Sequence, residues 1–369
     1  MSATTEPSDG TPGSPHRPTH RRLLHSRPHA PAGDADVDAT IVPAGRHASQ
    51  LEQAVELAAK LDTPLVALCS REAAAHDVGR RWANDAAVVA VDLRGRIRLP
   101  KLSTSAIINR TPFARDSDTA VKRNVGLALT RMLQWDRVLF LDDDIEGVQP
   151  DQTRRAAGLL DDFEIVGLMN NGFPDNSVVC HANRDTGAYQ STFIGAGAML
   201  FRGSRSQSLF PDIYNEDWFF VLDDDTISPC AVDGQFAQRP FDPYKNPGRA
   251  GSEEFGDCLA EGIYALLDSG RSIHEADRHF WEEFLTARRD LIGAILRRLP
   301  ATEISYFRRQ QIKECLLAAL ANLELITAEL CTIYLKAWRD DCERWRAWVT
   351  DLPRYDDIDD ALAHLGLYR

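Results

Sequence analysis

The sequence predicts an α/β protein, with a mainly parallel sheet flanked by helices and a helical appendage at its C-terminal end. Short apolar runs typical of buried strands alternate with helical periodicity over residues 38–270, at the spacing of βαβ units. Beyond about Ile273 the apolar residues recur every three or four positions and the strand signals stop. We therefore divide the chain into an N-terminal arm (1–36), a sheet-containing domain (37–272) and a helical C-terminal region (273–369).

The composition is that of a globular protein able to bury a large core. The 369 residues are 44% apolar and carry a formal net charge of −13, so the basic surface of a protein that coats nucleic acid is not expected. No apolar run approaches about 18 residues and the N-terminus lacks the apolar core of a signal peptide, which predicts no integral membrane segment. The seven cysteines show no CxxC spacing, which favours a reducing, cytoplasmic compartment over a disulfide scaffold.

The arm is rich in proline and histidine and nearly devoid of apolar residues. Such a segment gains too little from burial to offset its ordering entropy, so we expect it to be disordered. Its four histidines are irregularly spaced, which favours a solvated tail over a metal site. They are His16, His20, His25 and His29.

The first elements of the sheet domain follow from three apolar runs and one periodic segment. Residues 40–42 form a strand candidate that runs into the turn signal Pro43-Ala44-Gly45. Residues 51–61 carry apolar side chains at helical spacing. The apolar runs 64–69 and 87–91 predict the next two strands.

Two further strands and a helix complete the predicted sheet domain. A helix opens at Asp118, a candidate N-cap, and leads into the apolar strand 138–141. Gly126 on this helix permits close packing on the sheet or close approach of a ligand. Residues 164–168 extend the alternating pattern.

A stripe of apolar residues at helical spacing predicts one long helix in the C-terminal region. We expect this region to pack on the sheet domain, and a homodimer through paired C-terminal helices is the alternative. The stripe consists of Leu316, Leu320, Leu323, Ile326, Leu330, Ile333 and Ala337.

An aspartate triplet, Asp142-Asp143-Asp144, stands where strand 138–141 leaves the sheet. In open parallel sheets ligands bind at the carboxyl ends of strands. Three carboxylates concentrated there require a compensating cation or hydrogen-bond donors. A hard divalent ion, Mn²⁺ or Mg²⁺, shared with a diphosphate suits these oxygens, and acids splayed into water are the alternative.

A second acidic motif, Glu216-Asp217, lies between aromatic residues that include Trp218. A carboxylate in a half-buried cleft can act as a general base, and the alternative is a helix N-terminus with acids in its first turn. The preceding strand candidate, residues 191–201, contains Gly195 and Gly197, which leave backbone room for a ligand.

Taken in order, these motifs resemble those of glycosyltransferases of the Rossmann-like GT-A fold, particularly the inverting family 2 type. The resemblance covers roughly residues 38–270. It rests on an Arg-Asn-x-Gly helix, a strand ending in D-x-D, a glycine-bearing strand and a Glu-Asp pair. It implies transfer of a hexosyl group from a nucleotide-sugar donor to the hydroxyl of an unknown acceptor, with Mn²⁺ or Mg²⁺ as cofactor.

The resemblance also implies roles for the acids. Asp142 would lie near the ribose, Asp142 and Asp144 would bind the metal, and Asp143 would assist at the donor site. Asp217 would deprotonate the acceptor hydroxyl, and Glu216 would position it.

The resemblance places five further residues at the donor. Lys122, Arg123 and Asn124 match the helix that commonly lines the donor site. Pro43 and Arg46 follow the first strand, where the nucleoside often sits.

The sequence departs from the family in two ways. Residues 238–241 do not match the Q-x-x-R-W motif of processive members, so polymer synthesis is not expected. His274 and His279 match no late metal-binding motif. His181 is a cleft candidate, and a structural histidine is the alternative.

The acidic motifs also allow other assignments of metal site and function. The triplet Asp223-Asp224-Asp225 could be the metal site instead, but the Arg-Asn-x-Gly helix precedes the first triplet and the Glu-Asp pair follows it. Phosphatase and terpene-synthase patterns fail on spacing or on the predicted strand. A sugar nucleotidyltransferase would need a glycine-rich phosphate loop, for which residues 43–46 are too short. A non-catalytic protein of this fold that binds a nucleotide or a partner remains the alternative.

Overall fold

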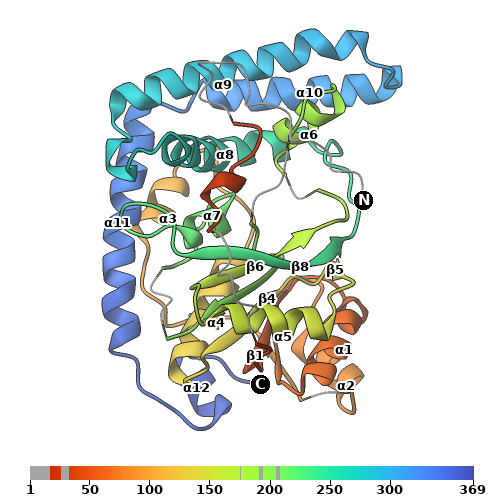
Figure 1. Ribbon diagram of the computed structural model, residues 1–369, viewed down its shortest axis with the longest axis vertical. Coiled ribbons are helices and arrows are strands. Elements are labelled where there is room, and N and C mark those ends of the chain that lie inside the picture. Colours follow the sequence, from red (N-terminus) through yellow and green to blue (C-terminus); the bar gives the residue numbers. More distant parts are fainter. Residues whose placement is uncertain (1–16, 26–32, 86, 175, 191–193, 205–207) are drawn as a thin grey trace.

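The computed structural model describes residues 17–25, 33–85, 87–174, 176–190, 194–204 and 208–369. It is an α/β protein in which helices cover both faces of one sheet and the C-terminal helices form a further layer (Figure 1). The strands are β1 Ala39–Ala44, β2 Leu65–Cys69, β3 Val88–Asp92, β4 Arg137–Leu141, β5 Ile145–Glu146, β6 Ile165–Asn170, β7 Ala198–Arg202 and β8 Cys230–Gln238.

The helices include short elements beside the sheet and long ones in the C-terminal half. They are α1 Glu52–Leu61, α2 Ala75–Trp82, α3 Ser103–Ile108, α4 Thr119–Met132, α5 Pro150–Leu159, α6 Val178–Asp185, α7 Glu216–Val221, α8 Pro247–Asp268, α9 Arg278–Arg298, α10 Tyr306–Leu323, α11 Ala328–Thr350 and α12 Ile358–His364.

The strand order is β3-β2-β1-β4-β7-β6-β8-β5. The pairs among β3, β2, β1 and β4 are parallel, as is β6 with β8. Strand β7 is antiparallel to both of its neighbours, and β5 is antiparallel to β8. The predicted fold class is therefore confirmed, with a mixed sheet in which parallel pairs outnumber antiparallel ones.

The predicted strands form because their apolar runs are buried on both faces of the sheet. Every residue of β1 and β2 is buried, as expected for central parallel strands. Alternate side chains of β4 join different cores: Phe140 packs with the cluster beneath α4 and α8, and Leu139 with the cluster beneath α1 and α5. Gly126 serves packing, because a Cβ there would lie 2.8 Å from the Phe140 ring.

The predicted glycine-bearing strand is shorter than expected. Strand β7 begins at Ala198, so Gly195 and Gly197 precede it in irregular backbone. The first part of that prediction, residues 191–193, lies outside the described residues. Because Gly195 and Gly197 are not paired with a neighbouring strand, their backbone can line a cavity beside the sheet.

The single long C-terminal helix was a wrong prediction. The apolar stripe is divided between α10 and α11, which are bent by 80° relative to each other. A new helix begins after Thr327, because the Thr327 hydroxyl accepts a hydrogen bond from the backbone N–H of Leu330 (3.0 Å) and caps the N-terminus of α11. One hydrophobic cluster runs from Val125 beside the sheet to Trp345 on α11.

Part of the N-terminal arm departs from the expected disorder. His20 is 3% exposed, and its Nε2 lies 3.2 Å from Glu261 and its Nδ1 2.5 Å from Asp268, both on α8. The backbone N–H of His25 donates to the carbonyl of Cys230 on β8 (3.0 Å). Two buried carboxylates on a distant helix anchor this segment. Residues 1–16 and 26–32 of the arm lie outside the described part.

Among the described residues, no single helix has the length and apolar character needed to cross a membrane. Helices α10 and α11 reach that length and composition only as a pair, with the 80° bend between them.

Candidate active site

The aspartate triplet occupies the turn between β4 and β5, at the carboxyl end of β4. The backbone N–H of Asp142 donates to the carbonyl of Gly197 (2.9 Å), and that of Ile145 donates to the carbonyl of Asp142 (3.2 Å). Asp143 and Asp144 are 5% and 9% exposed. Asp143 and Asp144 therefore lie in a protein-lined environment rather than splayed into water, and Asp142 is partly exposed.

Asp143 and Asp144 are held by the loop that follows β1. The Asp143 carboxylate accepts hydrogen bonds from the backbone N–H groups of Gly45 (2.7 Å) and Arg46 (2.9 Å), and it also pairs with the Arg46 guanidinium. Asp144 accepts from Arg46 Nη2 at 2.9 Å and from Gln238 Nε2 at 3.4 Å. Asp143 thus shapes the loop, while Asp144 joins β1 to the end of β8.

Arg123, on α4, connects the triplet to the Glu-Asp pair. Its Nη2 donates to both oxygens of Asp142 (2.9 and 3.0 Å), and its Nη1 donates to Glu216 (2.6 Å). The side chain is buried, and the guanidinium is held between the two acids. The two motifs that the sequence analysis singled out are therefore joined by one cation.

Burial dominates the protonation of both acids that flank Arg123. It raises the pKa of Asp142 to about 6; Arg123 opposes the shift, and the charges of Asp144 and Asp143 add to it. Burial likewise raises the pKa of Glu216 to about 7, opposed by Arg123 and reinforced by Asp217. Five carboxyl groups thus gather around the guanidinium groups of Arg123 and Arg46.

Glu216 and Asp217 form the first turn of α7, which follows Asn215 in a left-handed conformation (φ 61°). Asp217 Oδ2 accepts from the backbone N–H of Ala196 (3.0 Å), and its Oδ1 accepts from the backbone N–H of Trp218 (3.0 Å). A Cβ on Gly195 would lie 3.4 Å from Asp217 Oδ2, so the glycine gives this carboxylate room. The acids therefore open a helix and also line a cavity, and the role of general base stays a prediction.

A cavity of about 220 Å³ brings the two motifs together. Seven predicted site residues line it: Arg123, Asp142, Gly195, Gly197, Glu216, Asp217 and Trp218. Residues that the sequence analysis missed also line it, among them Arg115, Asn170, Tyr214, Gln238 and Arg249.

Two of the missed residues could have been found from the sequence. Asn170 is the last residue of β6 and Gln238 the last of β8, so both stand at carboxyl ends of parallel strands, as Asp142 does. Arg115 comes from a loop and Arg249 from the first turn of α8, and no local pattern marks either of them.

Three residues predicted at the donor site have other roles. The Asn124 amide donates to the carbonyl of Phe210 (2.7 Å) and accepts from its N–H (2.9 Å), which fixes a loop on α4. Lys122 Nζ is buried against the carbonyl of Ala44 (2.8 Å) and Asp118 (3.0 Å). Pro43 is a buried residue of β1 rather than part of a turn. None of the three lines the cavity.

Arg46 and His181 also lie outside the cavity lining. The Arg46 side chain is half exposed and holds Asp143 and Asp144. His181 is buried between Phe173 and Phe241, with ring centroids at 5.1 and 5.8 Å. Burial lowers the His181 pKa to about 3, so the structural alternative describes this histidine.

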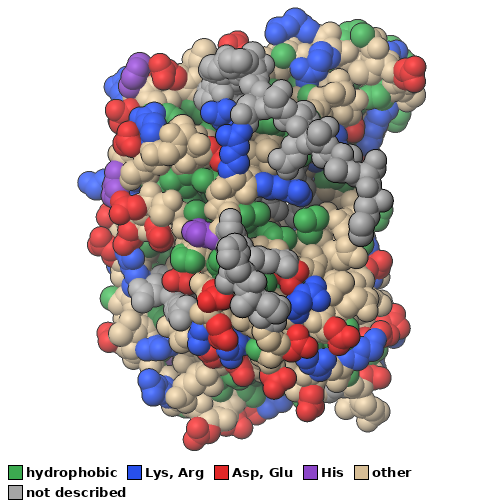
Figure 2. Space-filling model, in the orientation of Figure 1, with side chains coloured by type: hydrophobic (Ala, Val, Ile, Leu, Met, Phe, Trp, Pro, Cys, Tyr) green, Lys and Arg blue, Asp and Glu red, His purple; other side chains and the backbone are tan. Residues whose placement is uncertain are grey.

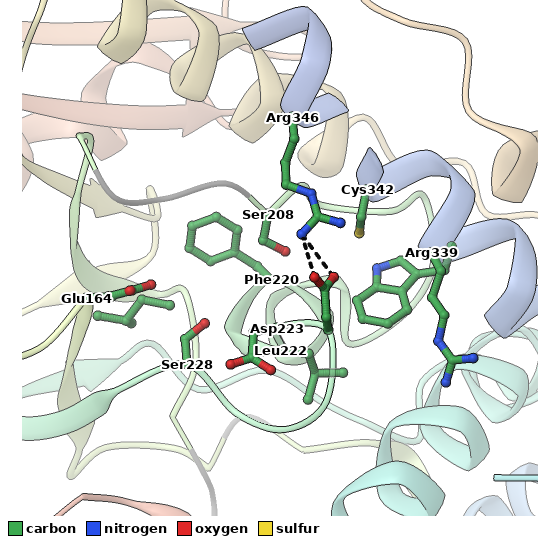
Figure 3. A pocket seen from close by; sticks show the side chains of 12 residues that line it. Glu164, Ser208, Phe220, Leu222, Asp223, Ser228, Arg339, Cys342 and Arg346 are labelled. Atoms are coloured by element: carbon green, nitrogen blue, oxygen red, sulfur yellow. Dashed lines mark hydrogen bonds and ion pairs between the residues drawn. The ribbon is translucent and has the colours of Figure 1, made fainter. Parts of the chain in front are cut away.

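The second triplet belongs to a different cavity, of about 280 Å³, that also includes Cys342 and Arg346 of α11 (Figure 3). Asp223 accepts from the backbone N–H groups of Asp225 (2.9 Å) and Thr226 (2.8 Å). Both oxygens of Asp224 lie 2.9 Å from Arg346 Nη1. These acids stabilise a turn and its contact with α11, and only the first triplet adjoins the Glu-Asp pair.

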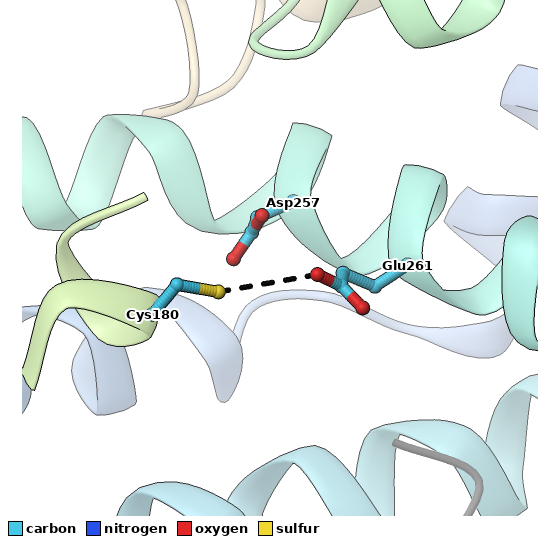
Figure 4. Close-up of side chains that lie close together, drawn as sticks. All are labelled: Cys180, Asp257 and Glu261. Atoms are coloured by element: carbon cyan, nitrogen blue, oxygen red, sulfur yellow. Dashed lines mark hydrogen bonds between the residues drawn. The ribbon is translucent and has the colours of Figure 1, made fainter. Parts of the chain in front are cut away.

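A buried cluster of Cys180, Asp257 and Glu261 has ligand atoms within 4.8 Å of one another (Figure 4). Its acids already have cationic partners: Arg288 lies 2.5 Å from Asp257, and His20 lies 3.2 Å from Glu261. Burial raises the pKa of the Cys180 thiol, which keeps it protonated. We interpret this cluster as an ion-pair network that binds α6 and the arm to α8.

No family model matches the chain. No curated protein matches it either. Among solved structures it is similar to the mannosyltransferase PcManGT from Pyrobaculum calidifontis in complex with GDP-Man and Mn²⁺, at 16% identity and a TM-score of 0.43. The match covers 90% of this chain and 88% of that one. Because identity and TM-score are both low, we argue function from the geometry of the site.

Proposed function

We propose that this chain is a glycosyltransferase that moves a sugar from a nucleoside-diphosphate donor to an acceptor hydroxyl. The observation that carries the proposal is that Asp142, the first acid of the triplet, and the Glu-Asp pair line one cavity, while Asp143 and Asp144 lie beside it, against the loop after β1. Arg123 contacts Asp142 and Glu216 at the same time.

Mn²⁺ or Mg²⁺ would be held by Asp142 and Asp144. Both offer hard carboxylate oxygens at the end of β4. Burial and neighbouring acids raise the pKa of Asp142 to about 6 although Arg123 bonds to it, so a divalent cation would add positive charge beside the contacts of Arg123 with Asp142 and of Arg46 with Asp144. When bound, the ion would stabilise the charge that develops on the departing nucleoside diphosphate.

Asp217 would accept the proton of the attacking acceptor hydroxyl. Two backbone N–H groups, of Ala196 and Trp218, fix the orientation of its carboxylate. Glu216, tied to Arg123, would position Asp217 and the acceptor. A direct displacement with this arrangement inverts the anomeric centre, in line with the resemblance to family 2.

Donor binding tests the metal site directly. With a panel of nucleoside-diphosphate sugars, the melting temperature should rise by mass action when Mn²⁺ is present. Asp144→Asn should remove most of this Mn²⁺-dependent rise. Asp224→Asn is the matched control from the second triplet and should retain it. The reverse pattern would place the metal at the second triplet, and a panel without any shift would contradict the proposal.

A further inference from the structure

The turn between α9 and α10 exposes apolar side chains that no element in the described part of the chain covers. Tyr306 and Phe307 are 71% and 72% exposed, and Leu317, farther along α10, is 48% exposed. Between the two helices lies a groove of about 410 Å³. It is lined by Leu296, Leu299, Pro300, Tyr306, Arg309, Gln310, Lys313 and Leu317.

The groove has cations but no carboxylate in its lining. Residues 291–317 contain five Arg and Lys residues and two Glu residues, a local charge of +3 in a chain of −13, which leaves −16 for the remaining residues. Figure 2 shows Lys and Arg side chains beside hydrophobic ones at the upper right corner, where Figure 1 places this turn. A basic, aromatic end on an acidic protein is the reverse of what its overall charge predicts.

Helices α9 and α10 form a hairpin, and hydrogen bonds within it and to the loop after β8 fix its turn. Arg309 Nη1 donates to the carbonyls of Pro300 (3.1 Å) and Thr302 (3.2 Å), which fastens the start of α10 to the turn. Arg308 Nη1 lies 2.6 Å from Asp242, in the loop after β8. Lys313 is exposed and lines the groove, and Arg297 is exposed next to the lining residue Leu296 on α9. The exposed rings of Tyr306 and Phe307 therefore lie on a turn that these contacts fix in place and that also carries cationic side chains.

We propose that this surface, defined by Leu296, Arg297, Tyr306, Phe307, Lys313 and Leu317, docks on an anionic lipid membrane. Tyrosine and other aromatic side chains favour the headgroup level of a bilayer, and basic side chains beside them add electrostatic attraction to anionic lipids. An apolar groove edged by Arg309 and Lys313 matches an acyl chain with a phosphate headgroup above it. Lipid binding here requires none of the residues proposed for sugar transfer.

Vesicle co-sedimentation with the full chain tests the proposal. The protein should bind vesicles of phosphatidylglycerol mixed with phosphatidylcholine, bind pure phosphatidylcholine at least tenfold more weakly, and dissociate as salt is raised. The double variant Arg297→Glu/Lys313→Glu should weaken binding at least tenfold. The double variant Tyr306→Ser/Phe307→Ser should weaken it several-fold on the same vesicles.

Exposed residues elsewhere provide the controls. Tyr368 is 71% exposed, as Tyr306 is, and Lys101 is exposed on a loop, so Tyr368→Ser/Lys101→Glu should bind like the unmodified chain. Melting temperatures of all variants should agree, because the changed side chains are exposed. Absence of vesicle binding, or binding that the hairpin variants leave unchanged, would overturn the proposal. A dimer in sedimentation velocity that these variants dissolve, without vesicle binding, would overturn it in favour of a second copy.

Discussion

At the scale of single residues, Arg123 joins acids that are far apart in the sequence. Asp142 lies 19 positions away and Glu216 lies 93 positions away, and both bond to the same buried guanidinium. Removing one partner of a buried ion pair leaves uncompensated charge in the interior, which is costly. Arg123 is thus both a structural centre and a wall of the proposed donor site.

We predict that Arg123→Met lowers the free energy of unfolding by about 3–5 kcal/mol at pH 8. The folded-state pKa values of Asp142 (about 6) and Glu216 (about 7) exceed the ordinary values of these groups, 3.8 and 4.5, so folding favours their protonated forms. The deficit should therefore shrink as the pH falls from 8 to 5. Denaturant unfolding at several pH values measures it.

Arg289→Met is the matched control for this prediction. Arg289 lies 2.7 Å from Glu324, but both side chains are largely exposed to water. Its loss should cost less than about 1 kcal/mol at any of these pH values. Equal losses of unfolding free energy in Arg123→Met and Arg289→Met would contradict the role of Arg123 as a buried ion-pair partner of Asp142 and Glu216.

The two acids of α7 should differ in their effect on transfer. Asp217→Asn should lower the transfer rate by about 10²–10⁴-fold, as for loss of a general base, while donor affinity stays unchanged. Glu216→Gln should cost less, because Glu216 bonds to Arg123 rather than to the acceptor. Initial rates of sugar transfer measure the effect of each substitution, and the stereochemistry of the product shows whether the anomeric centre is inverted. A larger loss in Glu216→Gln, whose pKa of about 7 also suits a base, would reverse the assignment.

Local pattern explains which of these residues could be predicted from the sequence. Asp142, Glu216 and Asp217 stand out because acids follow an apolar strand or interrupt aromatic residues. The ion pairs of Arg123 could not be predicted, since nothing local specifies a partner 93 positions away. The loop contacts of Asn124 and Lys122 could not be predicted either, because their partners Phe210 and Ala44 are distant in the sequence.

At the scale of elements, the N-terminal arm shows how one residue can order a polar segment. His20 is enclosed by Glu261, Asp268, Trp218 and Tyr264, and Trp218 also lines the cavity. The ordering of this segment could not be predicted, because the composition of the arm does not show that two acids of α8 bind His20. The break between α10 and α11 was missed for a related reason: the apolar stripe continues through it.

We predict that His20→Gln destabilises the protein most below neutral pH. Burial lowers the pKa of His20, but hydrogen bonds and charges of Asp268 and Glu261 outweigh it and raise the pKa from 6.5 to about 9. This contribution, about 2–3 kcal/mol, is present in full below pH 6.5 and is lost as the pH rises through 9. Thermal unfolding of both proteins at pH 6 and pH 9.5 measures the difference.

His274→Gln is the control, because His274 pairs with Asp225 on the surface and both side chains are mostly exposed. It should change the melting temperature little at either pH. If His20→Gln behaves in the same way, the arm does not anchor through His20.

At the scale of the whole molecule, the sheet order explains where the site lies. Strands β4, β6 and β8 end at one edge of the sheet, and their terminal or following residues Asp142, Asn170 and Gln238 all line the cavity. The apolar runs predicted β4 and β6 but not β8. The antiparallel β7 was not predicted, because a buried strand has the same apolar run in either direction.

Turnover of a nucleotide-sugar tests the central claim most directly. The full chain would be incubated with Mn²⁺ and a panel of nucleoside-diphosphate sugars, with water taking the sugar in place of the acceptor hydroxyl, and the released nucleoside diphosphate would be measured over time. We predict release from at least one donor, dependent on the metal and strongly reduced in Asp142→Asn but not in Asp224→Asn. Saturable donor binding without any release would contradict a transferase and identify a nucleotide-binding protein instead.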